Sequence, residues 1–135
     1  MSKKFIFAFV AYVVITFVMA AGWHLGVFAS VYERLGVFTR EQPIIALGVL
    51  SMFIQAGVVA YLYPRFYRGG SPVKTGALFG LLLGLFMGSN AVLAEAGKNN
   101  VGSITTWILL EGAFYVVWPI LVGIAVGLIY GKEAR

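Results

Sequence analysis

The sequence contains no cysteine and no aspartate, and charged residues make up only 11% of its 135 residues. Without cysteine, the chain can form neither a disulfide nor a thiolate metal site. Soluble domains carry about 25% charged residues, so this chain has too few charges to cover a surface that faces water. The scarcity of charge therefore excludes a soluble globular protein.

Long apolar runs take the place of the missing charges. Hydrophobic residues make up 61% of the chain, and its mean hydropathy is +0.93. A transmembrane helix needs about 20 mostly apolar residues, and four segments meet this requirement. The predicted spans are residues 5–31, 44–63, 73–96 and 104–129. Because the connections are short, we expect a single membrane domain over residues 1–135, an all-α, up-and-down bundle of four transmembrane helices.

Proline and glycine mark the expected ends of these helices. Pro43 suits the first turn of the second span, and Pro64 is expected to end it. The turn-forming residues 69–72 (GGSP) predict a loop before the third span. The first span, residues 5–31, contains no comparable break, so we expect one continuous helix there. Pro119 lies inside the fourth span and predicts a kink.

The basic residues are unevenly distributed between the two sides of the predicted bundle. Basic residues are enriched in cytoplasmic loops of membrane proteins, so the distribution predicts cytoplasmic N- and C-termini in a cell inner (plasma) membrane. The net charge of +5 then reflects topology and attraction to the lipid bilayer. We expect no nucleic acid partner. The side of the termini carries Lys3, Lys4, Arg65, Arg68, Lys74, Lys132 and Arg135, and the other side carries Arg34, Arg40 and Lys98.

Glycines recur every four residues along the third span, and a second set lies in the fourth. Small residues at this spacing allow helix backbones to approach closely within a membrane. The pattern predicts a glycine zipper, either between the third and fourth helices or between one of them and another protomer. The predicted helix-packing residues are Gly76, Gly80, Gly84, Gly88, Gly112, Gly123 and Gly127.

Few polar residues lie inside the spans, and each is a candidate functional residue because a polar group in lipid is costly. We expect an intramembrane polar cluster, mostly in the outer half of the membrane, in which His24 pairs with Glu111 or Glu95. Such groups can satisfy one another and fix helix register, or they can line a pocket for an ion or small molecule. The predicted cluster consists of His24, Gln55, Asn90, Glu95, Glu111 and Tyr115.

No pattern in the sequence indicates catalysis or a bound cofactor. The only histidine has no linked serine motif, and the chain has no phosphate-binding loop. His24 and the two glutamates lack the spacing of a metal site, and one histidine supplies only one axial ligand to a haem. The sequence predicts no catalytic residue, no metal and no cofactor. An enzyme with His24 and Glu111 as acid and base is the least favoured reading.

Three segments carry a resemblance to known proteins. Residues 23–28 (WHLGVF), 37–45 (VFTREQPII) and 110–112 (LEG) resemble a group of small four-helix bacterial inner-membrane proteins of unknown function. The resemblance covers nearly the whole chain. It implies an integral bacterial membrane protein with a histidine in its first span, and it supplies no activity.

Two functions from different classes remain open. The small size and short loops favour a noncatalytic accessory or structural subunit, which packs through its glycine-rich helix faces as a homo-oligomer or within a larger membrane complex. The alternative is a small transporter or channel in which several protomers surround a path lined by the polar cluster. One four-helix bundle of this size leaves little room for a pore, so the alternative requires oligomerisation.

Overall fold

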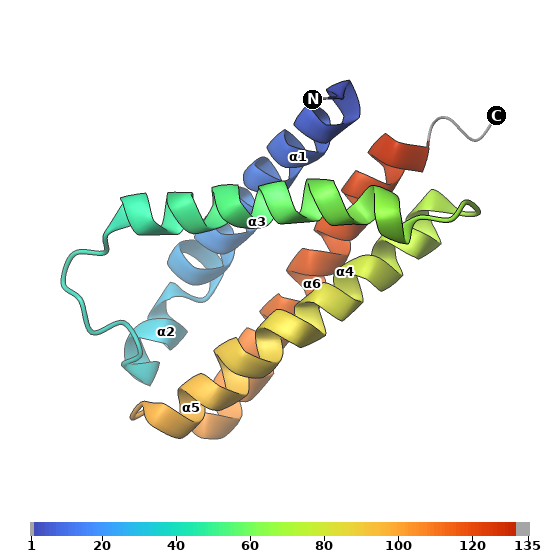
Figure 1. The fold of residues 1–135 in the computed structure, drawn as a ribbon. Coiled ribbons are helices and arrows are strands. Elements are labelled where there is room, and N and C mark those ends of the chain that lie inside the picture. The colour runs from blue at the N-terminus through green and yellow to red at the C-terminus, as the bar shows by residue number, and fades with distance from the viewer. Residues whose placement is uncertain (1, 132–135) are drawn as a thin grey trace.

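The structure is a computed structural model that describes residues 2–131, and within this range it consists of helices without strands (Figure 1). Four helical stretches are long and apolar enough to cross a membrane: Lys3–Val27, Ile45–Phe66, Pro72–Lys98 and Ile104–Tyr130. The expected helical bundle with four candidate spans is therefore present. The elements are α1 (Lys3–Ala20), the π-helix η1 (Ala21–Val27), α2 (Ala29–Leu35), α3 (Ile45–Phe66), α4 (Pro72–Gly88), the π-helix η2 (Ser89–Ala94), α5 (Glu95–Lys98) and α6 (Ile104–Tyr130).

The first span is not the single continuous helix that the sequence predicts. After Ala20 the chain widens into η1, where the amide of Phe28 donates to the Trp23 carbonyl five residues earlier, at 3.1 Å. Phe28 itself leaves the helical conformation (φ −110°, ψ 15°), and α2 begins after it. Two glycines in η1, Gly22 and Gly26, weaken the preference for a regular α-helix.

Pro64 does not end the second span, which continues to Phe66. Proline lacks an amide hydrogen, so the carbonyl four residues earlier loses its helical partner. In this structure that carbonyl belongs to Ala60, and it accepts a hydrogen bond of 2.8 Å from the Tyr130 hydroxyl. A side chain of α6 therefore satisfies the carbonyl that Pro64 leaves free, and α3 extends through the proline.

Helices α4 and α6 pack with their backbones in direct contact. A Cβ atom added at Gly80 would lie 2.0 Å from the Pro119 carbonyl oxygen, and one added at Gly76 would lie 2.3 Å from the Gly123 carbonyl oxygen. No real Cβ fits at such distances, so only glycine permits this approach. The contacts step four residues along each helix in opposite directions, which defines an antiparallel register. Further contacts of the same register join Gly84 with the Tyr115 carbonyl and Gly127 with the Pro72 carbonyl.

The two remaining glycines of the predicted packing set differ from each other. A Cβ at Gly88 would lie 2.8 Å from the Cβ of Tyr115, so Gly88 faces a side chain of α6 rather than its backbone. A Cβ at Gly112 would meet no atom within 4 Å. Gly112 therefore lies outside the close contact between α4 and α6.

Helix α1 lies against both α3 and α6, whereas α3 crosses the other helices obliquely (Figure 1). The Trp118 indole donates to the Thr16 hydroxyl at 2.9 Å, which joins α6 to α1 within the main core. All buried residues of α3 lie in its second half, from Ala56 onward. The first half of α3 extends past its neighbours and is mostly exposed. The buried residues of the main core are Ala8, Tyr12, Ala56, Val59, Ala60, Tyr63, Phe79, Phe114, Trp118, Val122 and Val126.

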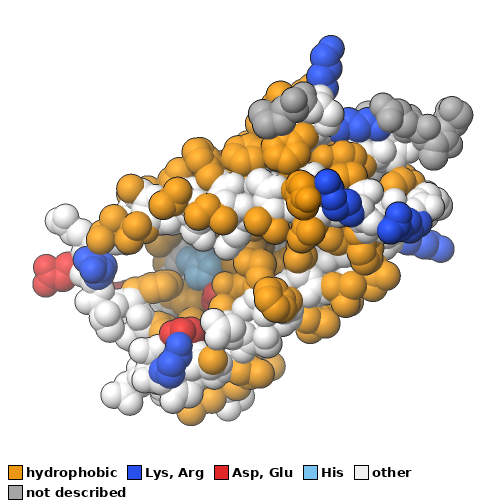
Figure 2. Space-filling view, viewed as in Figure 1, with side chains coloured by type: hydrophobic (Ala, Val, Ile, Leu, Met, Phe, Trp, Pro, Cys, Tyr) orange, Lys and Arg blue, Asp and Glu red, His pale blue; other side chains and the backbone are white. Residues whose placement is uncertain are grey.

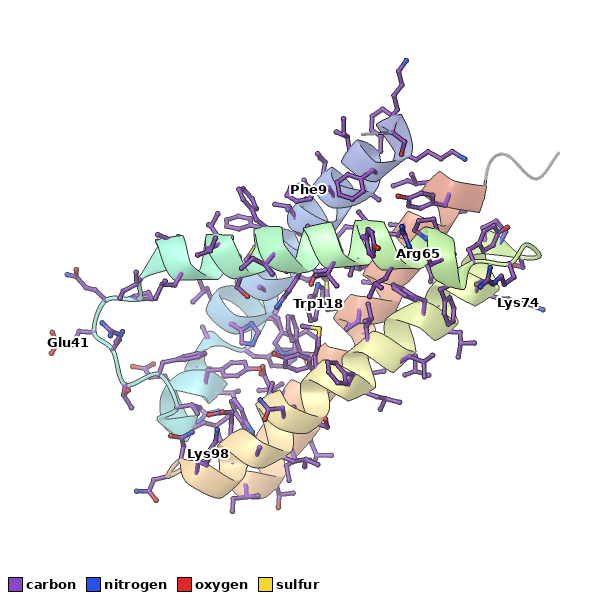
Figure 3. The ribbon with its side chains drawn as sticks, in the orientation of Figure 1. Phe9, Glu41, Arg65, Lys74, Lys98 and Trp118 are labelled. Carbon is purple, nitrogen blue, oxygen red and sulfur yellow. The ribbon has the colours of Figure 1, made fainter. Side chains whose placement is uncertain are left out.

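The start of α1 and the end of α6 lie at the same end of the bundle, where the Lys4 ammonium donates to the Tyr130 carbonyl at 3.2 Å. Figure 3 shows Arg65 and Lys74 toward this end and Glu41 and Lys98 toward the opposite one. Two basic residues that the sequence analysis assigns to the side of the termini, Lys132 and Arg135, lie outside the described residues.

The contact between α4 and α6 predicts a clear difference between two glycine substitutions. Gly80→Ala should lower the free energy of unfolding by about 1–3 kcal/mol, the usual cost of overpacking, because its Cβ would clash with the Pro119 carbonyl. Gly112→Ala, where a Cβ meets nothing, is the matched control and should leave stability unchanged or slightly higher. Unfolding in mixed detergent micelles, followed by circular dichroism, measures both. Equal stability of the two variants would contradict the packing.

Candidate functional site

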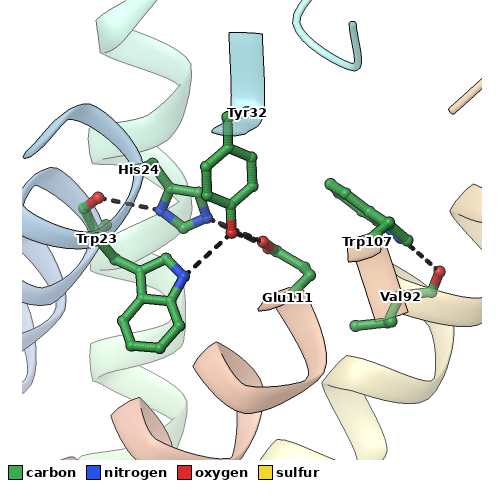
Figure 4. A network of polar contacts seen from close by, with 7 residues as sticks. Trp23, His24, Tyr32, Val92, Trp107 and Glu111 are labelled. Carbon is green, nitrogen blue, oxygen red and sulfur yellow. Dashed lines mark hydrogen bonds and ion pairs between the residues drawn. The ribbon is translucent and has the colours of Figure 1, made fainter. Parts of the chain in front are cut away.

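The imidazole of His24 lies against the carboxylate of Glu111, although the two residues are 87 positions apart in the sequence (Figure 4). His24 Nε2 is 3.1 Å from Glu111 Oε2 and 3.3 Å from Oε1. The side chain of His24 is 17% exposed and that of Glu111 is 9% exposed. η1 carries the histidine and α6 carries the glutamate, so the pair joins the first and last spans.

Two aromatic side chains complete the surroundings of Glu111. The hydroxyl of Tyr32, which lies in α2, donates to Glu111 Oε2. The indole of Trp23 donates to the Tyr32 oxygen at 3.1 Å. Burial, followed by the hydrogen bond to the Glu111 carboxylate, raises the pKa of Tyr32 well above its ordinary value, so its hydroxyl remains a donor.

The second ring nitrogen of His24 fixes the number of protons in the pair. Nδ1 lies 3.0 Å from the carbonyl oxygen of Ala20. A carbonyl only accepts hydrogen bonds, so Nδ1 carries a hydrogen. A bare Nε2 and a carboxylate oxygen would both be acceptors, so their contact at 3.1 Å requires one further proton between them. The pair is then either imidazolium with carboxylate or neutral imidazole with carboxylic acid. Both forms have zero net charge, which lowers the cost of burial in a membrane.

The π-helices help to place this network. A wider helical turn leaves carbonyl groups without their usual partner, and such turns are common at functional sites. His24 satisfies the Ala20 carbonyl at the start of η1. In η2, the Trp107 indole satisfies the Val92 carbonyl at 2.9 Å. Side chains thus compensate for the irregular backbone in both π-helices.

Aromatic rings surround His24. Its ring centroid lies 4.6 Å from those of Tyr32 and Phe114 and 6.3 Å from that of Phe38, which belongs to the loop before α3. Figure 2 shows a hollow in this face of the molecule with a histidine surface at its floor, and the chain has one histidine. The neutral pair therefore lies at the bottom of a hollow with aromatic walls.

Within residues 2–131, neither Gln55 nor Tyr115 is hydrogen-bonded to His24 or Glu111. Gln55 Oε1 accepts a hydrogen bond of 2.7 Å from the Tyr12 hydroxyl, and its amide donates to Ser51 at 3.2 Å. Tyr115 follows Glu111 by one turn of α6, and its ring contacts Phe114 edge to face. Gln55 thus forms a second polar contact, between α1 and α3.

Asn90 and Glu95 also lie away from His24. Glu95 accepts hydrogen bonds from Lys98 at 2.7 Å and from Asn99 at 2.8 Å, in an exposed position. Glu95 thus has two partners of its own and is not hydrogen-bonded to His24. Asn90 is exposed in η2, and within residues 2–131 its side chain makes no hydrogen bond. Of the six predicted cluster residues, the structure joins His24 and Glu111 directly.

Sequence reasoning missed Tyr32, Trp23 and Tyr12 as parts of polar contacts. Tyr32 lies just beyond the predicted first span, residues 5–31, and a continuous helix would not bring it to Glu111. The break at Phe28 instead turns α2 back toward α6, as the contact of Tyr32 with Glu111 shows. The signal available in the sequence was the hydroxyl and indole groups themselves, which usually find partners when buried.

Within residues 2–131, no group of three His, Cys, Asp or Glu side chains is arranged to hold a metal ion. Comparison of the chain with protein-family models, with curated proteins and with solved structures gives no significant match. The function must therefore be argued from this geometry.

The proton arrangement predicts that two substitutions of Glu111 change the free energy of unfolding by different amounts. Glu111→Gln should change the free energy of unfolding by less than about 1 kcal/mol, because an amide can donate to Nε2 and accept from Tyr32. Glu111→Leu leaves both partners unpaired and should cost about 3 kcal/mol. Chemical unfolding in micelles measures both. If Glu111→Gln were as unstable as Glu111→Leu, the shared proton would be the wrong description.

Proposed function

We propose that this protein is a noncatalytic multi-pass membrane protein that acts as an accessory or structural subunit. The observation that carries the proposal is the first half of α3. No residue of Ile45–Ile54 is buried within the chain, and its large side chains are exposed, including Ile45 (71%), Leu47 (61%) and Leu50 (54%). Val49 and Met52 are half-buried and the ring of Phe53 contacts that of Phe9, so one side of this stretch lies toward α1. Its remaining exposed sides offer a surface for a neighbouring transmembrane helix.

The intramembrane polar groups support the same proposal. His24, Glu111 and Tyr32 satisfy one another, and Gln55 pairs with Tyr12. Groups that are already paired hold the helices in place, and they need no substrate to complete them. The close contact between α4 and α6 likewise occupies the α4 glycines inside the chain, so these glycines are not available for contact with a partner.

Photocrosslinking tests this surface directly. A photoreactive residue at Leu47 in α3 should give a discrete crosslinked species in native membranes, either with a second copy or with another membrane protein. The same residue at Phe86 in α4, which is 79% exposed, serves as a control and should crosslink only to lipid. Crosslinks at Phe86 but not at Leu47, with a monomeric protein after gentle extraction, would contradict the proposal.

A second candidate is the small oligomeric transporter or channel. The observation that favours it is the hollow above His24, because the pair at its floor holds one proton between two exchangeable sites. Proton binding at such a carboxylate is a common step in transport. A transport role requires that Glu111→Gln abolish flux while the protein still folds, whereas a structural role tolerates this change.

The proposal places the chain in a bacterial inner membrane with both termini in the cytoplasm. Support comes from the described basic residues, most of which lie at the end where α1 begins. The opposite end carries the loop with Glu41 and the α5 residue Lys98.

The absence of native cysteine makes this orientation easy to test. Cysteine introduced as Glu41→Cys should react with a membrane-impermeant maleimide in intact cells whose outer membrane has been permeabilised. Cysteine introduced as Arg68→Cys should react only after the inner membrane is opened. The reverse pattern of labelling would show that the termini face outward.

A further inference from the structure

Glu111 is the only acidic side chain within residues 2–131 that is buried. Its carboxylate shares one proton with His24, whose Nε2 lies 3.1 Å from Oε2, so the pair has no net charge. A net charge inside a membrane is costly. A second cation can therefore lie beside Glu111 at low cost only if this proton leaves.

Within residues 2–131, no basic side chain other than His24 forms an ion pair or hydrogen bond with Glu111. Tyr32 from α2 and Tyr115 from α6 are the other titratable groups that interact with this carboxylate. A phenol is ordinarily neutral at pH 7, so the net charge of the site depends on the one shared proton. Glu95 pairs with Lys98. The remaining charged side chains of α2 and of the loop before α3 are exposed, and they are Glu33, Arg34, Arg40 and Glu41.

The rings around His24 suit an organic cation. The ring centroids of Tyr32 and Phe114 lie 4.6 Å from that of His24, and the centroid of Phe38 lies 6.3 Å from it. The rings of Tyr32 and Phe38 are stacked, with centroids 5.6 Å apart. Aromatic rings attract cations within about 6 Å of the ring centroid, most strongly where water is excluded. The site thus combines one carboxylate with several aromatic rings.

The hollow gives a ligand access to these groups from one side. Figure 2 shows the histidine surface at its floor, and the side chain of His24 is 17% exposed. Phe38 belongs to the loop between α2 and α3 and is 60% exposed. A ligand can therefore reach the rings without separating α4 from α6.

An inorganic cation fits this site less well. Ions such as Ca²⁺ and Mg²⁺ need about six or more oxygen ligands, and no group of three His, Cys, Asp or Glu within residues 2–131 could hold a metal ion. An alkylammonium ion needs no such set of ligands, because aromatic rings and one carboxylate are sufficient to recognise it.

We infer that the hollow binds a small organic cation of the alkylammonium class in exchange for the proton that His24 and Glu111 share. The proton leaves for water, and His24 keeps its Nδ1 hydrogen on the Ala20 carbonyl and becomes neutral. The Glu111 carboxylate then pairs with the bound cation. One positive charge enters and one leaves, so the site stays neutral. The inference goes beyond the proposed subunit function and does not rest on it, because photocrosslinking at Leu47 tests α3 separately.

Isothermal titration calorimetry of the detergent-solubilised protein with choline tests the site. Choline should bind saturably at one per chain. The uncharged alcohol 3,3-dimethyl-1-butanol has the same shape as choline and should bind at least about tenfold more weakly, because it lacks the positive charge. Titrations at pH 7 in two buffers of different ionisation enthalpy should show the release of about one proton per choline bound.

Three variants locate the binding. Glu111→Gln keeps the hydrogen bonds to His24 and Tyr32 but removes the negative charge, so it should abolish choline binding. Glu95→Gln removes a glutamate that pairs with Lys98 instead, and it should leave the dissociation constant unchanged. Phe38→Ala removes one ring from an exposed loop and should raise the dissociation constant about two- to fivefold.

Several outcomes would overturn the inference. Failure of choline to bind the native protein would remove the site altogether. Equal binding of choline and 3,3-dimethyl-1-butanol would identify an apolar hollow without selectivity for charge. Unchanged affinity in Glu111→Gln or in Phe38→Ala would place the cation elsewhere, and binding without proton release would contradict the exchange. None of these results would alter the crosslinks expected at Leu47.

Discussion

The close approach of α4 and α6 is the constraint on which the rest of this bundle depends. In a lipid environment, apolar side chains gain little by leaving the lipid, so packing and hydrogen bonds must hold the helices together. Glycines on α4 place its backbone against the carbonyls of Pro119 and Gly123, where Cα–H groups can contact carbonyl oxygens. The proline contributes because its ring leaves the Tyr115 carbonyl free, and that carbonyl faces Gly84. This register fixes the depth of α6 and thereby the position of Glu111.

Once α6 is placed, the polar network determines how the first span ends. His24 reaches Glu111 from η1, and Tyr32 reaches the same carboxylate from α2. The turn at Phe28 makes this possible, because a straight helix would carry Tyr32 away. A neutral pair that holds one proton is far less costly to bury than a lone carboxylate. The first half of α3 contributes no buried residue, so the bundle combines the close pair of α4 and α6 with a helix that is mostly exposed over its first half.

Apolar runs and glycine spacing predicted most of this fold, because span length and small-residue periodicity are local properties of the sequence. The pairing of His24 with one of two glutamates was also foreseeable, since polar groups in a membrane seek partners. The sequence left the choice between Glu111 and Glu95 open, and in the structure Glu95 pairs with Lys98, three residues later. The π-helices and the turn at Phe28 were not predicted, because the two glycines of η1 weaken a helix without indicating how it ends, and the partners of the freed carbonyls come from tertiary contacts. Tyr32 was missed for that reason.

The two ends of the molecule differ in chemistry. Among residues 2–131, one end carries basic residues and no acidic one, and the other carries both basic and acidic residues together with the aromatic hollow over His24. This asymmetry supports the proposal that the protein has one orientation in the membrane and contacts a partner through α3. The His24–Glu111 pair joins the first and last spans inside the bundle.

The ¹⁵N NMR spectrum of His24 tests the central claim most directly, because the chain has a single histidine and its signals need no assignment. The account predicts a protonated Nδ1 bonded to a carbonyl, and an Nε2 signal that changes in Glu111→Gln. A histidine protonated only at Nε2, with Nδ1 bare and no response to Glu111→Gln, would contradict the account.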